Sequence, residues 1–132
     1  MVLFCFLSLF VSCANHKEAI KAQADRLYEE ARHKEPLPPH RFESDGCSLW
    51  WDGNWWDCCV IHDFCYWMGG TREERKECDR RLMHCVAAKC HPFMARVMYL
   101  GVRIGGVPWA NTTFRWGFGW EYPQTGPPDK PY

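Results

Sequence analysis

One histidine and one aspartate stand where they could act together as an acid–base pair. His62 lies between Cys58 and Cys65, and Asp79 directly follows Cys78. If the cysteines hold two helices together, Asp79 faces His62. A carboxylate beside an imidazole selects the tautomer and stabilises the protonated ring, as a general base requires. The sequence therefore predicts a catalytic pair, although a buried histidine with a purely structural role is the alternative.

A second carboxylate, Asp63, stands next to His62 and projects about 100° further around a helix. There it could meet the glycine-containing loop that ends at Asp57. Backbone carbonyls and a carboxylate are hard oxygen ligands of the kind that calcium takes. We therefore expect Asp63 to bind a metal ion rather than to be an ordinary surface charge.

The spacing of four cysteines predicts two helices side by side. Cys58 and Cys65 are seven residues apart, as are Cys78 and Cys85, so each pair occupies one face of its helix. The short Gly-Gly link at 69–70 is compatible only with antiparallel helices. Disulfides would then join Cys58 to Cys85 and Cys65 to Cys78, each contributing about 2–4 kcal/mol.

The other cysteines extend this scheme. Cys59 points away from the paired face, and Cys47 in the preceding loop is its expected partner. Cys90 is then left over. A chain of 132 residues with nine cysteines indicates an oxidising compartment, where disulfides supplement a small core.

Three helices are expected in the compact part of the chain. Asp57 suits the N-cap of a helix over residues 58–68, which the glycine pair ends. A capping box opens a second helix over 71–89, and a third follows over 94–104. The compact domain should span 41–122.

Residues 14–40 are expected to form a polar helix followed by a proline-rich linker. Along this helix four apolar residues recur at spacings of four, three and four, which produces one narrow stripe: Ile20, Ala24, Leu27 and Ala31. At the other end of the chain, aromatic residues alternate with other types over 114–122, and a period of two indicates a strand. The proline-rich tail, 123–132, is predicted to be disordered.

The first 13 residues resemble an export signal. Residues 2–12 are apolar but fall short of the roughly 20 residues that a membrane span needs. Residues 10–13 are similar to a bacterial lipoprotein box, in which Cys13 would be lipidated. The expected location is periplasmic or secreted, with Cys13 as a candidate membrane anchor. Acidic and basic residues balance at sixteen each, so net charge directs the chain neither to nucleic acid nor to anionic membranes.

The residues around His62 carry a specific resemblance. Residues 58–66, Cys-Cys-Val-Ile-His-Asp-Phe-Cys-Tyr, resemble the active-site helix of secreted phospholipases A2. The second helix of that family carries Cys-Asp-Arg and a further cysteine, as residues 78–85 do here. The resemblance covers residues 45–89 and implies a mainly α fold. Its expected form is an antiparallel two-helix core cross-linked by disulfides, with a short, aromatic-rich β or irregular C-terminal segment.

The resemblance also implies an activity, the calcium-dependent hydrolysis of a phospholipid acyl ester. His62 would activate water, Asp79 would orient His62, and Tyr66 would hydrogen-bond Asp79. The calcium ligands would be Asp63 and loop oxygens of Ser48, Trp50 and Asp52. The expected partner is a phospholipid substrate or a membrane surface.

Three alternatives remain at this point. The loop at 48–56 is rich in tryptophan where the family has glycines, which favours a non-catalytic relative that binds lipid or protein. The four tryptophans of this loop either form a lip facing lipid or fill the core: Trp50, Trp51, Trp55 and Trp56. The third possibility is a zinc module, which would require a reducing compartment. Its ligands would come from Cys58, Cys59, His62 and Cys65, and the site could be completed by His84, Cys85, Cys90 and His91.

Overall fold

The protein is mainly helical. The computed structural model describes residues 2–34, 36–47 and 53–132, and within them it has helices but no strand. The helices are α1 (Val2–Ala31), α2 (Trp56–Met68), α3 (Arg72–Lys89) and α4 (Pro92–Gly105). The mainly α expectation is therefore confirmed.

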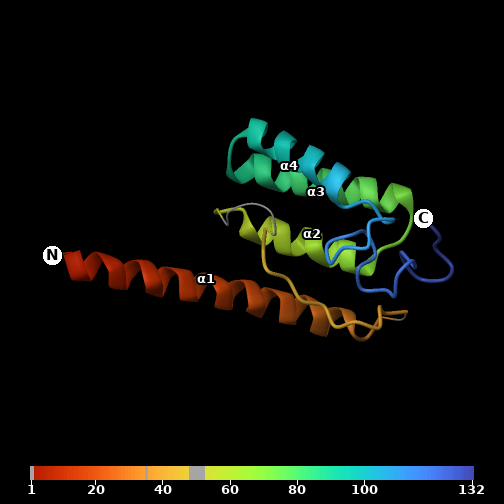
Figure 1. Ribbon diagram of the computed structural model, residues 1–132, viewed down its shortest axis with the longest axis horizontal. Coiled ribbons are helices and arrows are strands. Elements are labelled where there is room, and N and C mark those ends of the chain that lie inside the picture. The colour runs from red at the N-terminus through yellow and green to blue at the C-terminus, as the bar shows by residue number, and fades with distance from the viewer. Residues whose placement is uncertain (1, 35, 48–52) are drawn as a thin grey trace.

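The helices pack in the order α1, α2, α3, α4 (Figure 1). α2 and α3 run in opposite directions, as do α3 and α4, while α1 covers the other side of α2. α2 is therefore the central element. Val60 and Trp67 on one side of it are fully buried in a cluster with α1, whereas Cys58 and Cys65 face α3.

Among the residues that the structure describes, three disulfides hold this arrangement together. Cys58 is bonded to Cys85 and Cys65 to Cys78, which joins α2 to α3 at two levels, and Cys47 is bonded to Cys59. Cys90 is exposed and unbridged. The structure thus agrees with the pairing that the spacing predicts, and the disulfides fit a protein of an oxidising compartment.

The two ends of α2 differ in how well they were predicted. Gly69 ends the helix with a positive φ of 66°, a conformation that glycine adopts without steric penalty. Asp57, however, is not the N-cap. The helix begins two residues earlier than predicted, at Trp56 with Trp55 as N-cap, and the Asp57 carboxylate instead forms an ion pair with Lys89 of α3.

α3 and α4 begin with side-chain caps. Thr71 and Glu74 form the predicted capping box reciprocally, each bonding the backbone of the other. α4 starts at Pro92, two residues before the predicted start, with the His91 side chain accepting from the Phe93 N–H. Proline suits a first helical position because its missing N–H would have no partner there.

α1 carries the predicted apolar stripe. Ile20, Ala24 and Ala31 are buried against α2, and Leu27 packs on the same cluster. The helix is longer than predicted, because it continues back through the apolar segment to Val2. Within the described residues, none of the helices is long and apolar enough to cross a membrane.

The segment after α4 is not a strand, contrary to the alternation of its aromatic residues. Residues 106–132 form a series of turns. Gly117 N–H donates to the Tyr66 carbonyl at 2.7 Å and Gly119 N–H to the Trp67 carbonyl at 3.2 Å. The Trp120 indole N–H donates to the Met68 carbonyl at 2.7 Å. These are the last carbonyls of α2, which have no partner within a helix, so the segment serves as a cap for α2.

The last ten residues also differ from the prediction of a disordered tail. Lys130 forms an ion pair with Glu74, and the Tyr132 hydroxyl accepts a hydrogen bond from Arg75 at 3.0 Å. Both partners lie on α3. The tail is thus held by polar contacts that its proline-rich composition does not reveal.

Replacing Gly117 by alanine should destabilise the protein. Gly117 has a φ of 77°, and a Cβ there would lie 2.4 Å from the backbone carbonyl oxygen of Thr125. We expect the free energy of unfolding, measured in urea, to fall by about 2 kcal/mol or more. The matched control is Gly105→Ala, where a Cβ meets nothing within 4 Å and alanine should stabilise the helix by up to about 1 kcal/mol. Equal losses in the two variants would contradict this backbone conformation.

Candidate functional site

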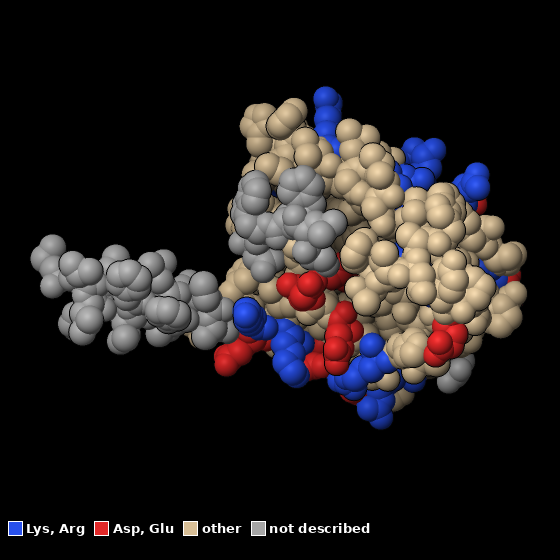
Figure 2. All heavy atoms as spheres, in the orientation of Figure 1, with Lys and Arg blue, Asp and Glu red and all other residues tan. Residues whose placement is uncertain are grey.

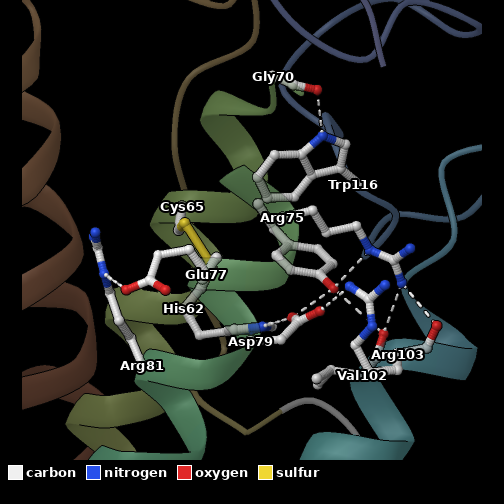
Figure 3. The surroundings of a disulfide bond; sticks show 12 residues. His62, Cys65, Gly70, Arg75, Glu77, Asp79, Arg81, Val102, Arg103 and Trp116 are labelled. Atoms are coloured by element: carbon white, nitrogen blue, oxygen red, sulfur yellow. Dashed lines mark hydrogen bonds and ion pairs between the residues drawn. A yellow bond between two sulfur atoms is a disulfide. The ribbon is translucent and has the colours of Figure 1, made fainter. Parts of the chain in front are cut away.

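His62 of α2 and Asp79 of α3 face each other across the helix pair (Figure 3). His62 Nε2 lies 2.8 Å from Asp79 Oδ1. Only 7% of His62 is exposed and none of Asp79. The predicted contact is confirmed, and its basis is local. The disulfides on either side of His62 bring α2 against α3, and Asp79 is the residue next to one of their cysteines.

Tyr66 completes this group, as the resemblance implied. Its hydroxyl donates to Asp79 Oδ1 at 2.8 Å, and its ring lies 4.3 Å from the His62 ring, centroid to centroid. Burial and the negative charge of Asp79 raise the pKa of Tyr66 above its ordinary value. The phenol therefore keeps its proton and remains a donor to the carboxylate.

Arg103 of α4 is a further partner of Asp79 that the sequence analysis missed. Its Nη1 lies 2.7 Å from Asp79 Oδ2, so the two carboxylate oxygens have different partners. Burial alone would raise the pKa of Asp79, but hydrogen bonds from His62, Arg103 and Tyr66 outweigh it and hold the pKa below its usual value. Asp79 is therefore a buried anion with three donors around it.

Arg75 of α3, also missed, is almost fully buried behind the same group. Its Nε donates to the Tyr66 hydroxyl at 3.1 Å, and its Nη2 donates to the carbonyls of Val102 and Arg103 at 3.2 and 2.8 Å (Figure 3). These carbonyls belong to the last turn of α4. Arg75 thus holds Tyr66 in place and caps α4. The sequence held a signal for this role, because a residue four positions before Asp79 lies on the same face of the helix and should be buried with it.

His62 borders an apolar cavity of about 130 Å³ between α2 and α4. Tyr66 and Leu82 form part of its wall, and α4 contributes Met98 and Val102. Gly106 is required nearby, because a Cβ there would lie 2.4 Å from the Tyr66 ring. The site therefore combines a polar pair with an apolar chamber, as small-molecule sites do, but the chamber is smaller than the roughly 300–1,000 Å³ of most such sites.

The structure describes only one of the four residues predicted to bind calcium, Asp63. Asp63 lies against the segment before α2, where its Oδ2 accepts a hydrogen bond from the Ser44 hydroxyl at 2.6 Å. It also lines a hollow of about 470 Å³ together with Glu43 and Asp45. No group of three or more metal-ligating side chains occurs in the part of the chain that the structure describes. The other predicted ligands, Ser48, Trp50 and Asp52, lie outside the described residues.

The structure bears on two of the alternatives, the zinc module and the lip of tryptophans. Four of the five cysteines considered for zinc, at residues 58, 59, 65 and 85, are in disulfides and offer no thiolate to a metal, which leaves only Cys90 of that set. Trp55 is buried in the core and Trp56 packs half-buried near α1, so neither forms a lip. Trp50 and Trp51 lie outside the described residues.

Comparisons with models of protein families, with curated proteins and with solved structures found no match to this chain.

Replacing Asp79 by asparagine should destabilise the fold and flatten its response to acid. We expect a loss of about 3–5 kcal/mol in the free energy of unfolding at neutral pH, because Arg103 loses its counter-charge and His62 and Tyr66 lose a charged hydrogen-bond acceptor. The folded-state pKa of Asp79 lies below the unfolded value, near 3.8. The stabilisation is therefore complete above that value and is lost as the pH falls through the folded pKa.

Urea unfolding at about pH 5 and about pH 2 checks the predicted response of stability to acid. Wild type should lose more free energy of unfolding over this interval than Asp79→Asn. The exposed carboxylate of Asp129 supplies the control, and Asp129→Asn should behave as wild type. A variant slope as steep as that of wild type would show that Asp79 is not the group responsible.

Proposed function

We propose that this protein is a calcium-dependent hydrolase of phospholipid acyl esters, similar in its catalytic group to secreted phospholipases A2. The observation that carries the proposal is the buried His62–Asp79 pair at the wall of an apolar cavity. A pair with a purely structural role has no need of an adjoining chamber. The disulfides support a location outside the cytoplasm for this enzyme, as does the export signal expected from residues 1–13.

In this proposal His62 is the general base. Its Nε2 is bonded to Asp79, so the other ring nitrogen, Nδ1, takes a proton from the attacking water. Asp79 then stabilises the imidazolium that forms. Because Tyr66 and Arg103 hold the two oxygens of Asp79 separately, the carboxylate keeps its orientation through the proton transfer.

The cavity suits an acyl chain. Its wall from α4 and α3 is formed by Met98, Val102 and Leu82, with glycines at 101 and 105 leaving space. An acyl chain beside these side chains would lose apolar surface to water, which favours binding by about 25 cal/mol per Å². The ester at its end would then lie near His62.

Asp63 fits a calcium ligand by its chemistry. Its carboxylate is partly exposed, and it adjoins the described start of the loop that would supply carbonyl oxygens, at Gly46 and Cys47. Ser48, Trp50 and Asp52 complete the proposed set. When bound, calcium supplies positive charge near the reacting carbonyl.

One observation favours the second candidate, a non-catalytic lipid- or protein-binding module. Arg103 forms an ion pair with Asp79 and so already neutralises its charge. The carboxylate therefore stabilises an imidazolium at His62 less strongly. A structural network would have the same appearance. The two candidates differ in whether His62 is needed for turnover.

The substitution His62→Gln should abolish hydrolysis. With mixed phospholipid micelles and calcium, wild type should release fatty acid, and release should stop in EGTA. His62→Gln should reduce release by about 10²-fold or more, because the general base is lost. The control is His84→Gln, an exposed histidine on α3, which should retain wild-type release.

The melting temperature of each variant shows whether loss of activity reflects unfolding. If the folded wild type releases no fatty acid with calcium present, the enzyme proposal fails and the binding module remains. Calcium-independent release that survives His62→Gln would instead place the activity elsewhere in the chain.

A further inference from the structure

Residues 125–132 lie along the start of α3 and reach the buried group around Asp79. The Gly70 N–H, just before α3, donates to the Thr125 carbonyl at 2.9 Å. One turn into the helix, the Tyr132 hydroxyl accepts a hydrogen bond from Arg75 Nη1 at 3.0 Å. The Tyr132 ring also packs on the buried cluster that contains Tyr66. This segment therefore contacts the side chains behind the candidate site, although it is distant from them in sequence.

Arg75 connects Tyr132 to both side chains that hold the oxygens of Asp79. Arg75 is only 2% exposed, unlike the Lys and Arg side chains that project at the edges of the face shown in Figure 2. Its Nε donates to the Tyr66 hydroxyl, and its Nη2 donates to the Arg103 carbonyl. Tyr66 in turn bonds Oδ1 of Asp79, and Arg103 bonds Oδ2. A shift of the guanidinium would therefore disturb both oxygens of the carboxylate.

Arg75 also determines where the Tyr66 hydroxyl directs its hydrogen. That hydroxyl lies 2.8 Å from Asp79 Oδ1 and 3.3 Å from the Val102 carbonyl oxygen, so two acceptors compete for one hydrogen. A guanidinium keeps its protons, so Arg75 can only donate to the Tyr66 oxygen. Arg75 Nη2 also donates to the Val102 carbonyl at 3.2 Å. Because the competing acceptor is already bonded, the hydrogen of Tyr66 is directed to Asp79.

We propose that Tyr132 is a positioning residue for the His62–Asp79 pair. It acts through Arg75 and Tyr66. The Tyr132 hydroxyl fixes the guanidinium, the guanidinium fixes the Tyr66 hydroxyl, and that hydroxyl orients the carboxylate that holds His62. We call Tyr132, Arg75, Tyr66 and Asp79 the Tyr132 network. The effect on turnover rests on the proposed function, whereas the network itself needs no catalysis.

The substitution Tyr132→Phe removes the hydroxyl and keeps the ring. With mixed phospholipid micelles and calcium, we expect kcat for fatty acid release to fall by about three- to tenfold, the coupling typical within one hydrogen-bond network. Neither Arg75 nor Tyr132 is among the described residues that line the cavity, so KM should stay unchanged. The matched control is Tyr122→Phe, which removes an exposed hydroxyl bonded to the Trp109 carbonyl and should retain wild-type kcat.

A double substitution shows whether Tyr132 acts through Tyr66. The substitution Tyr66→Phe interrupts the Tyr132 network. In that background Tyr132→Phe should change kcat by less than about twofold, because the contact through which it acts is already absent. A loss as large as in the wild type would overturn the proposal. So would a Tyr132→Phe protein with a lower melting temperature and an unchanged kcat, since its contact would then be purely structural.

Exchange of the Arg75 Nε–H with water, followed by NMR, tests the network without catalysis. A buried N–H exchanges only when local opening exposes it. We expect exchange several times faster in Tyr132→Phe and unchanged in Tyr122→Phe. Faster exchange in a protein that releases no fatty acid would retain the network and remove the proposed enzyme. Unchanged exchange in a fully active Tyr132→Phe would overturn the role of Tyr132 and leave the enzyme, so the two proposals fail separately.

Discussion

A single buried carboxylate organises this protein. Asp79 has no exposed surface, and an isolated ionised carboxylate in such a place is strongly unfavourable. It is tolerated because donors from the two neighbouring helices surround it: His62 and Tyr66 of α2 and Arg103 of α4. The helices must keep these positions as long as Asp79 is charged. The group proposed for catalysis is thus also a constraint on the fold.

The backbone carbonyls at the ends of α2 and α4 accept hydrogen bonds from other parts of the chain. The carbonyls that end α2 are bonded by Gly117, Gly119 and Trp120 of the C-terminal segment. Arg75 does the same for α4. In both cases the partner comes from a distant part of the chain. This explains how a segment without regular structure contributes to stability, since it supplies the hydrogen bonds that a helix cannot make for itself.

The packing of α4 on α3 decides which apolar side chains of α4 are exposed. α4 uses Met98 and Ala95 to cover α3, and its opposite side remains apolar and exposed. The stretch after Asp79 has no acidic residue up to Glu121, and its Lys89 and Arg103 pair with carboxylates from earlier in the chain, Asp57 and Asp79. Total net charge describes none of this, because the effect of a charge depends on where it lies and on its partner.

Much of the frame could be predicted from the sequence, because it depends on local periodicity. Cysteines seven residues apart and a Gly-Gly link between two helices were enough to predict both interhelical disulfides, and with them the contact of His62 with Asp79. The capping box at Thr71 and the stripe on α1 are equally local. The strand over 114–122 was wrong because alternation reports a repeat of side chains, whereas the backbone there bonds the end of α2. Asp57 was wrong as an N-cap because Lys89, distant in sequence, takes its carboxylate.

The sequence by itself thus determined the helices, the pairing of the cysteines and the contact between His62 and Asp79. Only the tertiary structure decided which groups neutralise Asp79, which segment ends α2, and which side of α4 stays uncovered. The physical reason is that helix formation depends on neighbours within one or two turns. A buried charge or an unpaired carbonyl takes its partner from whatever part of the chain the packing brings within hydrogen-bond distance.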